Sequence, residues 1–229
     1  MESVATDIFA TKGVEYLIVI AYLVVLVGFW KLLSVPREPT AARAQPDHSS
    51  GRRWLHLRDG YYFHQGHSWA QLEEGDVVRV GVDDFAMRLL GRPATVDLPE
   101  VGAHLRQGEP GWQFEVDAKF IPMLSPVEGE VTEVNWEVQL SPDLASDEPY
   151  DRGWLLKVRV PNARANLKNL LKGKLARAWI DEVLENLRRM RAGELGIVMP
   201  DGGIPVDGFA RTLSPDRWDE LARRFLLSD

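Results

Sequence analysis

The chain has 229 residues, of which 45% are hydrophobic and 27% are charged, and its formal net charge is −7. It contains no cysteine, which excludes disulfides, thiolate metal sites and a cysteine nucleophile. The acidic balance argues against general nucleic-acid binding, because that function needs a basic surface. The length suits one domain with extensions, or two small domains.

The first predicted element is an apolar helix near the N-terminus. Residues 16–30 form an uncharged apolar run, and the wider range 14–35 reaches the roughly 20 residues that cross a hydrocarbon core. Tyr16 and Trp30 occupy positions typical of interface anchors, and Lys31 can extend its amine to the headgroups. We predict a retained single membrane span rather than a cleaved signal peptide, because no basic region precedes it and no small-residue cleavage site follows.

The charges that flank this helix predict its orientation. Lys12 precedes the apolar run, whereas five basic residues follow it: Lys31, Arg37, Arg43, Arg52 and Arg53. The positive-inside rule therefore places the bulk of the chain in the cytoplasm, at the cell membrane. Residues 1–35 are predicted to be the anchor, and residues 36–53, rich in Pro, Ala and Arg, are predicted to be a linker.

Residues 54–161 have the pattern of a β-rich domain. Short segments with β-branched or aromatic residues alternate with turn signals, which is typical of a small sandwich or barrel. The predicted strands cover 61–63, 77–82, 94–98, 113–116, 129–134 and 154–160, with a short helix over 83–90.

Residues 162–229 change to a helical period, so the predicted fold class is α+β. The apolar stripe of a helix over 165–191 consists of Leu167, Leu171, Leu175, Trp179, Val183, Leu187 and Met190. Its opposite face is basic, and three interpretations stay open: packing on its own domain, contact with anionic lipid, or binding of a partner subunit. We predict a loop or hairpin over 196–212 and a last helix that begins at Ser214, whose apolar side holds Trp218, Leu221, Ala222 and Phe225.

Few residues suggest chemistry of their own. His56, His64 and His67 lack further ligands in a metal-binding pattern, so we interpret them as strand or loop histidines. Asp83 and Asp84 could form a carboxylate pair, but their place at a helix start favours capping. We therefore predict no catalytic residue, no metal site and no enzymatic activity.

Several motifs occur in an order that carries a resemblance. They are His67-Ser68-Trp69, the segment 78–86 (VRVGVDDFA), Leu90-Gly91, the segment 96–102 (VDLPEVG), the segment 125–131 (SPVEGEV) and the segment 147–155 (DEPYDRGWL). Residues 62–160 thereby resemble the H protein of the glycine cleavage system. The resemblance implies a flattened β-barrel or sandwich of the lipoyl type. It does not cover the anchor, the linker or the helical extension.

The resemblance also implies one working residue, a lysine at a hairpin tip that carries lipoate. Counted back from Ser125 without gaps, Glu115 takes the family's glutamate position and Ala118 takes the lysine position, while Lys119 follows one residue later. A shift of one residue in a hairpin turns a side chain to the other face. Lys119 is thus a displaced candidate for lipoyl attachment.

The residues after Lys119 are apolar, which suits docking better than a swinging arm. We predict that Phe120, Ile121 and Met123 form an interaction surface at the hairpin tip. Two hypotheses follow. The favoured one is a non-catalytic scaffold or accessory subunit of a membrane complex, without a cofactor, whose partners are the membrane and other protein subunits. The alternative is a carrier with lipoate on Lys119 that shuttles electrons, acyl groups or aminomethyl groups.

Overall fold

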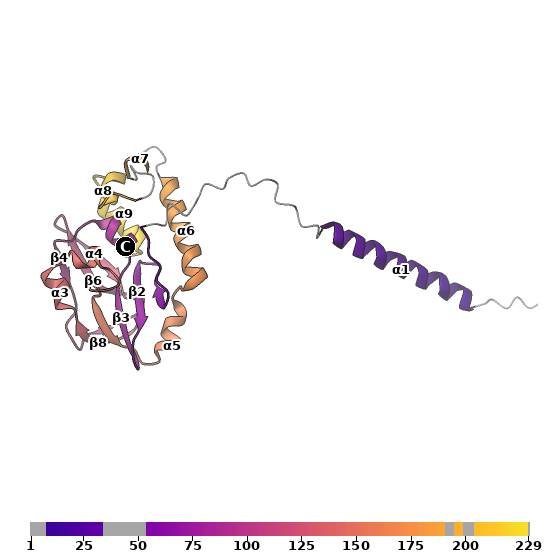
Figure 1. Ribbon diagram of the computed structural model, residues 1–229, viewed down its shortest axis with the longest axis horizontal. Coiled ribbons are helices and arrows are strands. Elements are labelled where there is room, and N and C mark those ends of the chain that lie inside the picture. Colours follow the sequence, from indigo (N-terminus) through magenta and orange to yellow (C-terminus); the bar gives the residue numbers. More distant parts are fainter. Residues whose placement is uncertain (1–7, 34–53, 191–194, 199–203, 229) are drawn as a thin grey trace, which may run out of the picture. The chain divides into compact units, whose positions relative to one another are not determined.

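The computed structural model describes residues 8–33, 54–190, 195–198 and 204–228 (Figure 1). The chain divides into two compact units, residues 1–47 and residues 48–229, and each is described here by itself. The predicted linker over 36–53 lies outside the described residues.

The N-terminal unit contains one helix, α1 (Ile8–Leu33), where the sequence predicts a helix over 14–35. Its described side chains, at 16–27 and Phe29, are mostly apolar and exposed, and Tyr16 is 67% exposed. The side chains of Trp30 and Lys31 lie outside the described residues. Within the part of the chain that the structure describes, we find no helix with both the length and the apolar character needed to cross a membrane.

The second unit is an antiparallel β structure with helices, which confirms the α+β class. A six-stranded sheet has the order β1-β2-β3-β9-β8-β5, and a three-stranded sheet has the order β4-β6-β7. The strands are β1 (Tyr61–Phe63), β2 (Ser68–Leu72), β3 (Val77–Val82), β4 (Thr95–Asp97), β5 (His104–Leu105), β6 (Pro110–Val116), β7 (Lys119–Leu124), β8 (Gly129–Val134) and β9 (Leu156–Arg159).

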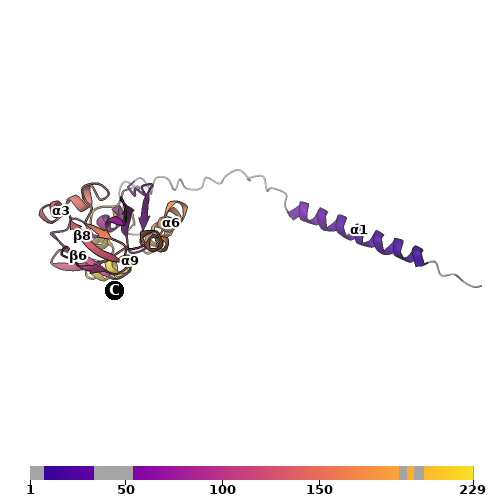
Figure 2. The same ribbon diagram turned by 90° about the horizontal axis from the view of Figure 1, so that it is seen from below.

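The helices follow the strands in two groups. Three short helices interrupt the β region: α2 (Asp84–Leu90), α3 (Trp136–Leu140) and α4 (Leu144–Asp147). The C-terminal group comprises α5 (Ala163–Asn166), the 3-10 turn η2 (Leu167–Asn169), α6 (Gly173–Met190), α7 (Leu195–Val198), α8 (Phe209–Leu213) and α9 (Trp218–Leu226). Figures 1 and 2 show this group beside the sheets, with α6 along one edge of the domain.

One continuous core joins the sheets to the helices. The three-stranded sheet contributes Phe114 and Ile121, and the six-stranded sheet contributes Val80 and Val158, all fully buried. The C-terminal helices add Ile180, Leu184 and Leu187 from α6, and Ala222 and Leu226 from α9, to the same cluster. Helix α6 therefore packs on its own domain, which was one of the three interpretations of the sequence.

An aromatic cluster forms a second, smaller core. Trp69 is fully buried and donates its indole N–H to the carbonyl of Val82 at 2.8 Å. The ring of Tyr61 meets Trp69 edge-on at 5.1 Å. Gly81 makes this possible, because a Cβ at that position would lie 2.5 Å from the indole ring. The close approach of β3 to Trp69 thus requires a residue without a side chain.

The predicted helix over 165–191 is wrong at its start. The backbone of Leu171 exchanges two hydrogen bonds of 2.8 Å with Phe63, so this residue extends the sheet edge at β1 instead of joining a helix. The buried face of α6 holds Ala176, Ile180, Leu184 and Leu187, whereas Leu175 is 67% exposed. The predicted stripe therefore fails at Leu175 but holds for Trp179 and Val183, which pack against the core, and for the buried Leu187.

Candidate functional site at the β6–β7 hairpin

The hairpin formed by β6 and β7 contains the position where the resemblance implies a modified lysine. Val116 pairs with Lys119, so Asp117 and Ala118 alone make the turn. Both have positive φ angles, 50° and 59°, as a type I′ turn requires. Ala118 lies in this turn, and Lys119 is the first residue of β7.

The amine of Lys119 is engaged by the C-terminal helices. Its Nζ lies 2.5 Å from Oδ1 of Asp219 and 5.6 Å from the centre of the Trp218 ring. The hydrogen bond from Lys119 lowers the pKa of Asp219. The Lys119 side chain keeps 39% of its surface exposed, so the pair is partly open to solvent.

We call α8 and α9 together the C-terminal cap, because they hold both the turn and the lysine. Arg211 of α8 pairs with the carboxylate of Asp117, and its guanidinium lies 4.8 Å from the centre of the Trp218 ring. Arg223 of α9 donates a hydrogen bond of 3.0 Å to the carbonyl of Phe120. The outer edge of β7 is thereby covered, as sheet edges commonly are in native proteins.

The predicted apolar interaction surface is wrong for two of its three residues. Ile121 and Met123 are fully buried, because alternate side chains of β7 point into the core. Phe120 points the other way and is 50% exposed. Only Phe120 of this set is available at the surface.

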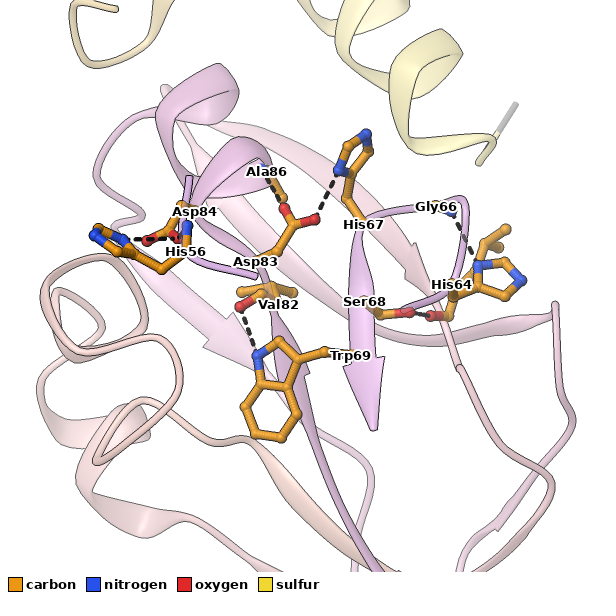
Figure 3. A network of polar contacts seen from close by, with 11 residues as sticks. His56, His64, Gly66, His67, Ser68, Trp69, Val82, Asp83, Asp84 and Ala86 are labelled. Atoms are coloured by element: carbon orange, nitrogen blue, oxygen red, sulfur yellow. Dashed lines mark hydrogen bonds and ion pairs between the residues drawn. The ribbon is translucent and has the colours of Figure 1, made fainter. Parts of the chain in front are cut away.

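A buried polar network joins the start of β2 to the start of α2. Nδ1 of His67 lies 2.8 Å from Oδ2 of Asp83, and both side chains are buried (Figure 3). The other oxygen of Asp83 accepts from the backbone N–H of Ala86 at 2.9 Å, which is the helix cap that the sequence predicted. The His67 ring stacks on Phe85 at 4.3 Å and packs against Trp179 of α6 at 4.8 Å. The network therefore positions α6 as well as α2.

The other two histidines of the predicted set, His56 and His64, make structural contacts. His64 accepts a hydrogen bond of 3.0 Å from the backbone N–H of Gly66, and burial lowers the pKa of its ring. His56 donates its backbone N–H to Asp84 at 2.8 Å (Figure 3). No group of three or more potential metal ligands gathers within the described ranges.

Asp84 is the one carboxyl group with a strongly raised pKa in the described structure. Burial raises its pKa to about 6, and the charge of Asp83 adds to this effect, while the hydrogen bond from His56 opposes it. The side chain is 15% exposed and borders a cavity of about 490 Å³ between α2 and α4. A group whose pKa is raised on folding stabilises the folded state below its unfolded pKa and loses that effect as the pH rises through the folded value.

We therefore expect Asp84 to make stability depend on pH. When the pH falls from 7.5 to 5, the free energy of unfolding of the wild-type protein should rise by about 1.4 kcal/mol relative to that of Asp84→Asn. The reason is that the carboxyl group of the folded protein binds a proton in this window. Urea unfolding of the full chain in mild detergent at both pH values measures the difference. Asp59→Asn is the control, since the Asp59 side chain is 96% exposed. Parallel pH profiles of wild type and Asp84→Asn would contradict the prediction.

Comparison with known proteins identifies the β domain. The family model described as "Glycine cleavage H-protein" matches residues 61–183. The glycine cleavage system H protein of Rubrobacter xylanophilus is 45% identical over 94 residues, which cover 41% of this chain and 74% of that protein. A probable glycine cleavage system H protein of Pyrococcus abyssi is 37% identical over 115 residues, which cover 50% of this chain and 85% of that protein.

A solved structure is also similar. The crystal structure of the glycine cleavage system H protein from Mycobacterium marinum matches with a TM-score of 0.48 and 27% identity, over 55% of this chain and 98% of that one. The range of the family model, residues 61–183, contains the β domain and ends within α6, and further helices follow it. The chain belongs to the glycine cleavage H-protein family, since the family model covers more than half of its residues.

The residues of the cap were not found from the sequence. Trp218 was predicted only as part of an apolar helix face, and neither Asp219 nor Arg211 stood out. The sequence offered one signal for these residues, a Trp with adjacent charges in a predicted helix. Nothing in that pattern indicates the hairpin, which lies about a hundred positions earlier in the chain.

Proposed function

We propose that this protein is a non-catalytic member of the H-protein family that serves as a scaffold or accessory subunit of a membrane complex. The observation that carries the proposal is the engagement of the Lys119 amine by Asp219 under the C-terminal cap. The pairing with Asp219 supports an unmodified Lys119. Acylation would remove the ammonium charge that pairs with Asp219, and the attached arm would start beside Trp218.

The place of the protein in the cell is part of the same proposal. Residues 1–35 act as a single-pass anchor in the cell membrane, residues 36–53 act as a linker, and the family domain lies on the cytoplasmic side. The exposed apolar side chains along α1 support the anchor, and the basic residues that follow the helix support the orientation. Extraction of membranes with carbonate, compared with extraction by detergent, tests the anchor. Protease access to the domain in sealed inverted vesicles tests the orientation.

The second candidate function is that of a lipoyl carrier, and family membership favours it. In that function lipoate on Lys119 would carry electrons, acyl groups or aminomethyl groups between partner subunits. The partly exposed side chain of Lys119 gives a ligase some access to the amine.

Intact mass of the protein from its native host separates the two functions. We expect the unmodified mass, because the amine at position 119 is paired and Ala118 occupies the tip of the turn. Lys119→Arg keeps a positive charge for Asp219 and is expected to retain full function in cells. A mass increased by one lipoyl group, lost in Lys119→Arg together with function, would establish the carrier instead.

The partners are identified by isolation of the full-length protein in mild detergent. We expect other protein subunits to copurify with wild type and with Lys119→Arg in the same ratio. Copurification that depends on the lysine would favour the carrier.

A further inference from the structure

A basic patch covers the segment that joins the β domain to α6. The chain is acidic overall, yet residues 163–180 contain no Asp or Glu. The cations of this segment are all exposed, and together they define the basic patch: Arg164, Lys168, Lys172, Lys174 and Arg177.

Most of these charges are not neutralised within the protein. Among the described residues, no carboxylate pairs with Arg164, Lys168 or Lys174, and Lys172 lies over the Tyr62 ring at 5.0 Å. Arg177 approaches the carboxylate of Asp59 at 3.7 Å, where both groups are largely exposed.

Apart from Asp59 beside Arg177, the nearby acidic residues lie at the borders of the patch. Asp181 and Glu182 follow one turn later on α6. On the other side, Glu128 donates its backbone N–H to the side chain of Asn166. The patch is therefore a local surface of positive charge with defined limits.

An exposed apolar side chain lies within the patch. Leu175 is 67% exposed, while the next residue, Ala176, is buried against the aromatic cluster. The neighbouring backbone is fixed, because Leu171 is hydrogen-bonded to Phe63 and Ile180 is fully buried in the core. Leu175 thus lies between Lys174 and Arg177 in the first turns of α6, on a backbone held by Leu171 and Ile180.

We propose that the basic patch binds the anionic phospholipid headgroups of the bilayer that holds α1, with Leu175 inserted between them. The inference rests on the proposed membrane function. Cations near an anionic leaflet are attracted within a Debye length of about 8 Å, and apolar side chains among such cations enter the interfacial layer. Residues 34–53 separate α1 from Trp54, and an extended chain of that length reaches at most about 70 Å, so the bilayer stays within range.

The absence of cysteine from the chain allows a direct test. Leu175→Cys in the full-length protein carries an environment-sensitive fluorophore, and the protein is placed in nanodiscs of phosphatidylcholine, with or without phosphatidylglycerol. We expect a blue shift and quenching by headgroup-level nitroxide lipids only in the anionic discs, both reversed by high salt. Leu140→Cys on α3 is the matched control, because Leu140 is 74% exposed but lies outside the patch.

A charge-reversed variant completes the test. Arg164→Glu, Lys168→Glu and Lys174→Glu together should abolish the blue shift at position 175 without changing the unfolding midpoint, since all three side chains are exposed. The proposal for the patch is overturned if the fluorophore on Leu175→Cys gives the same spectrum in both lipid mixtures, or if its shift survives charge reversal. Either result leaves the proposed anchor intact. Protein that never enters the discs overturns the proposed anchor, and with it this inference.

Discussion

Asp83→Ala is expected to destabilise the protein by about 3 kcal/mol. This estimate combines the loss of a helix cap, about 1 kcal/mol, with a buried His67 donor left without its acceptor, about 1–3 kcal/mol. Both contacts come from one carboxyl group that is 1% exposed, so water cannot replace it without rearrangement. The loss also reaches α6, because the His67 ring packs against Trp179.

Urea unfolding of the full-length protein in mild detergent measures this effect as a shift of the midpoint at constant slope. Asp83→Asn is the matched variant. Asparagine is an equally good cap and offers His67 a neutral acceptor, so its cost should be clearly smaller. If Asp83→Ala lies within about 0.5 kcal/mol of wild type, the network does not stabilise the fold as described.

Local patterns predicted the elements that depend on local interactions. The strands at 61–63, 77–82 and 129–134 have the predicted limits, and α2 begins after the predicted cap. In these segments, alternating apolar residues and turn residues mark the limits of the strands, even though β3 and β8 both pair with the distant β9. The family resemblance and the displaced Lys119 were also visible in the sequence.

The errors arise where distant segments meet. Leu171 has a helical spacing from its neighbours, but pairing with Phe63 at the sheet edge removes it from the helix. Residues 209–212 were predicted as part of a loop or hairpin but belong to α8, which packs Phe209 against Phe85. The last helix begins at Trp218 instead of Ser214. In the first two cases a tertiary contact overrides local propensity.

The candidate site also combines features that the sequence indicated with contacts between distant segments that it did not indicate. The family resemblance, with positions counted back from Ser125, indicated the hairpin and its lysine. It could not show that Lys119 meets Asp219, because the two residues are 100 positions apart and belong to segments with unrelated patterns. The buried positions of Ile121 and Met123 likewise depend on which face of β7 meets the core. The surroundings of the Lys119 amine therefore depend on the C-terminal cap.

Trp218→Ala tests that conclusion most directly and should have the largest effect on the cap. The ring is 6% exposed and belongs to the main core, so its truncation is expected to cost about 3–5 kcal/mol. The cations of Lys119 and Arg211 also lie near the indole, at 5.6 Å and 4.8 Å from its centre. Without it, the contacts of the cap with the turn should loosen.

Two quantities are measured. One is the urea midpoint, and the other is the rate at which an amine-reactive reagent labels Lys119, which peptide mass spectrometry reports. Trp136→Ala is the control for stability, because Trp136 is 64% exposed and should stay within about 0.5 kcal/mol of wild type. Trp218→Ala should unfold earlier and label faster at Lys119 under conditions where the protein is still folded.

A milder variant separates the cap from global stability. Asp219→Asn removes the partner of Lys119 but keeps the packing of α9, and a partly exposed ion pair contributes no more than about 1 kcal/mol. It should therefore label faster at Lys119 with a nearly unchanged midpoint. Equal labelling rates in wild type, Asp219→Asn and Trp218→Ala would mean that the amine is already free. The case against a modified lysine at this hairpin would then fail, because that case depends on the cap keeping the amine engaged.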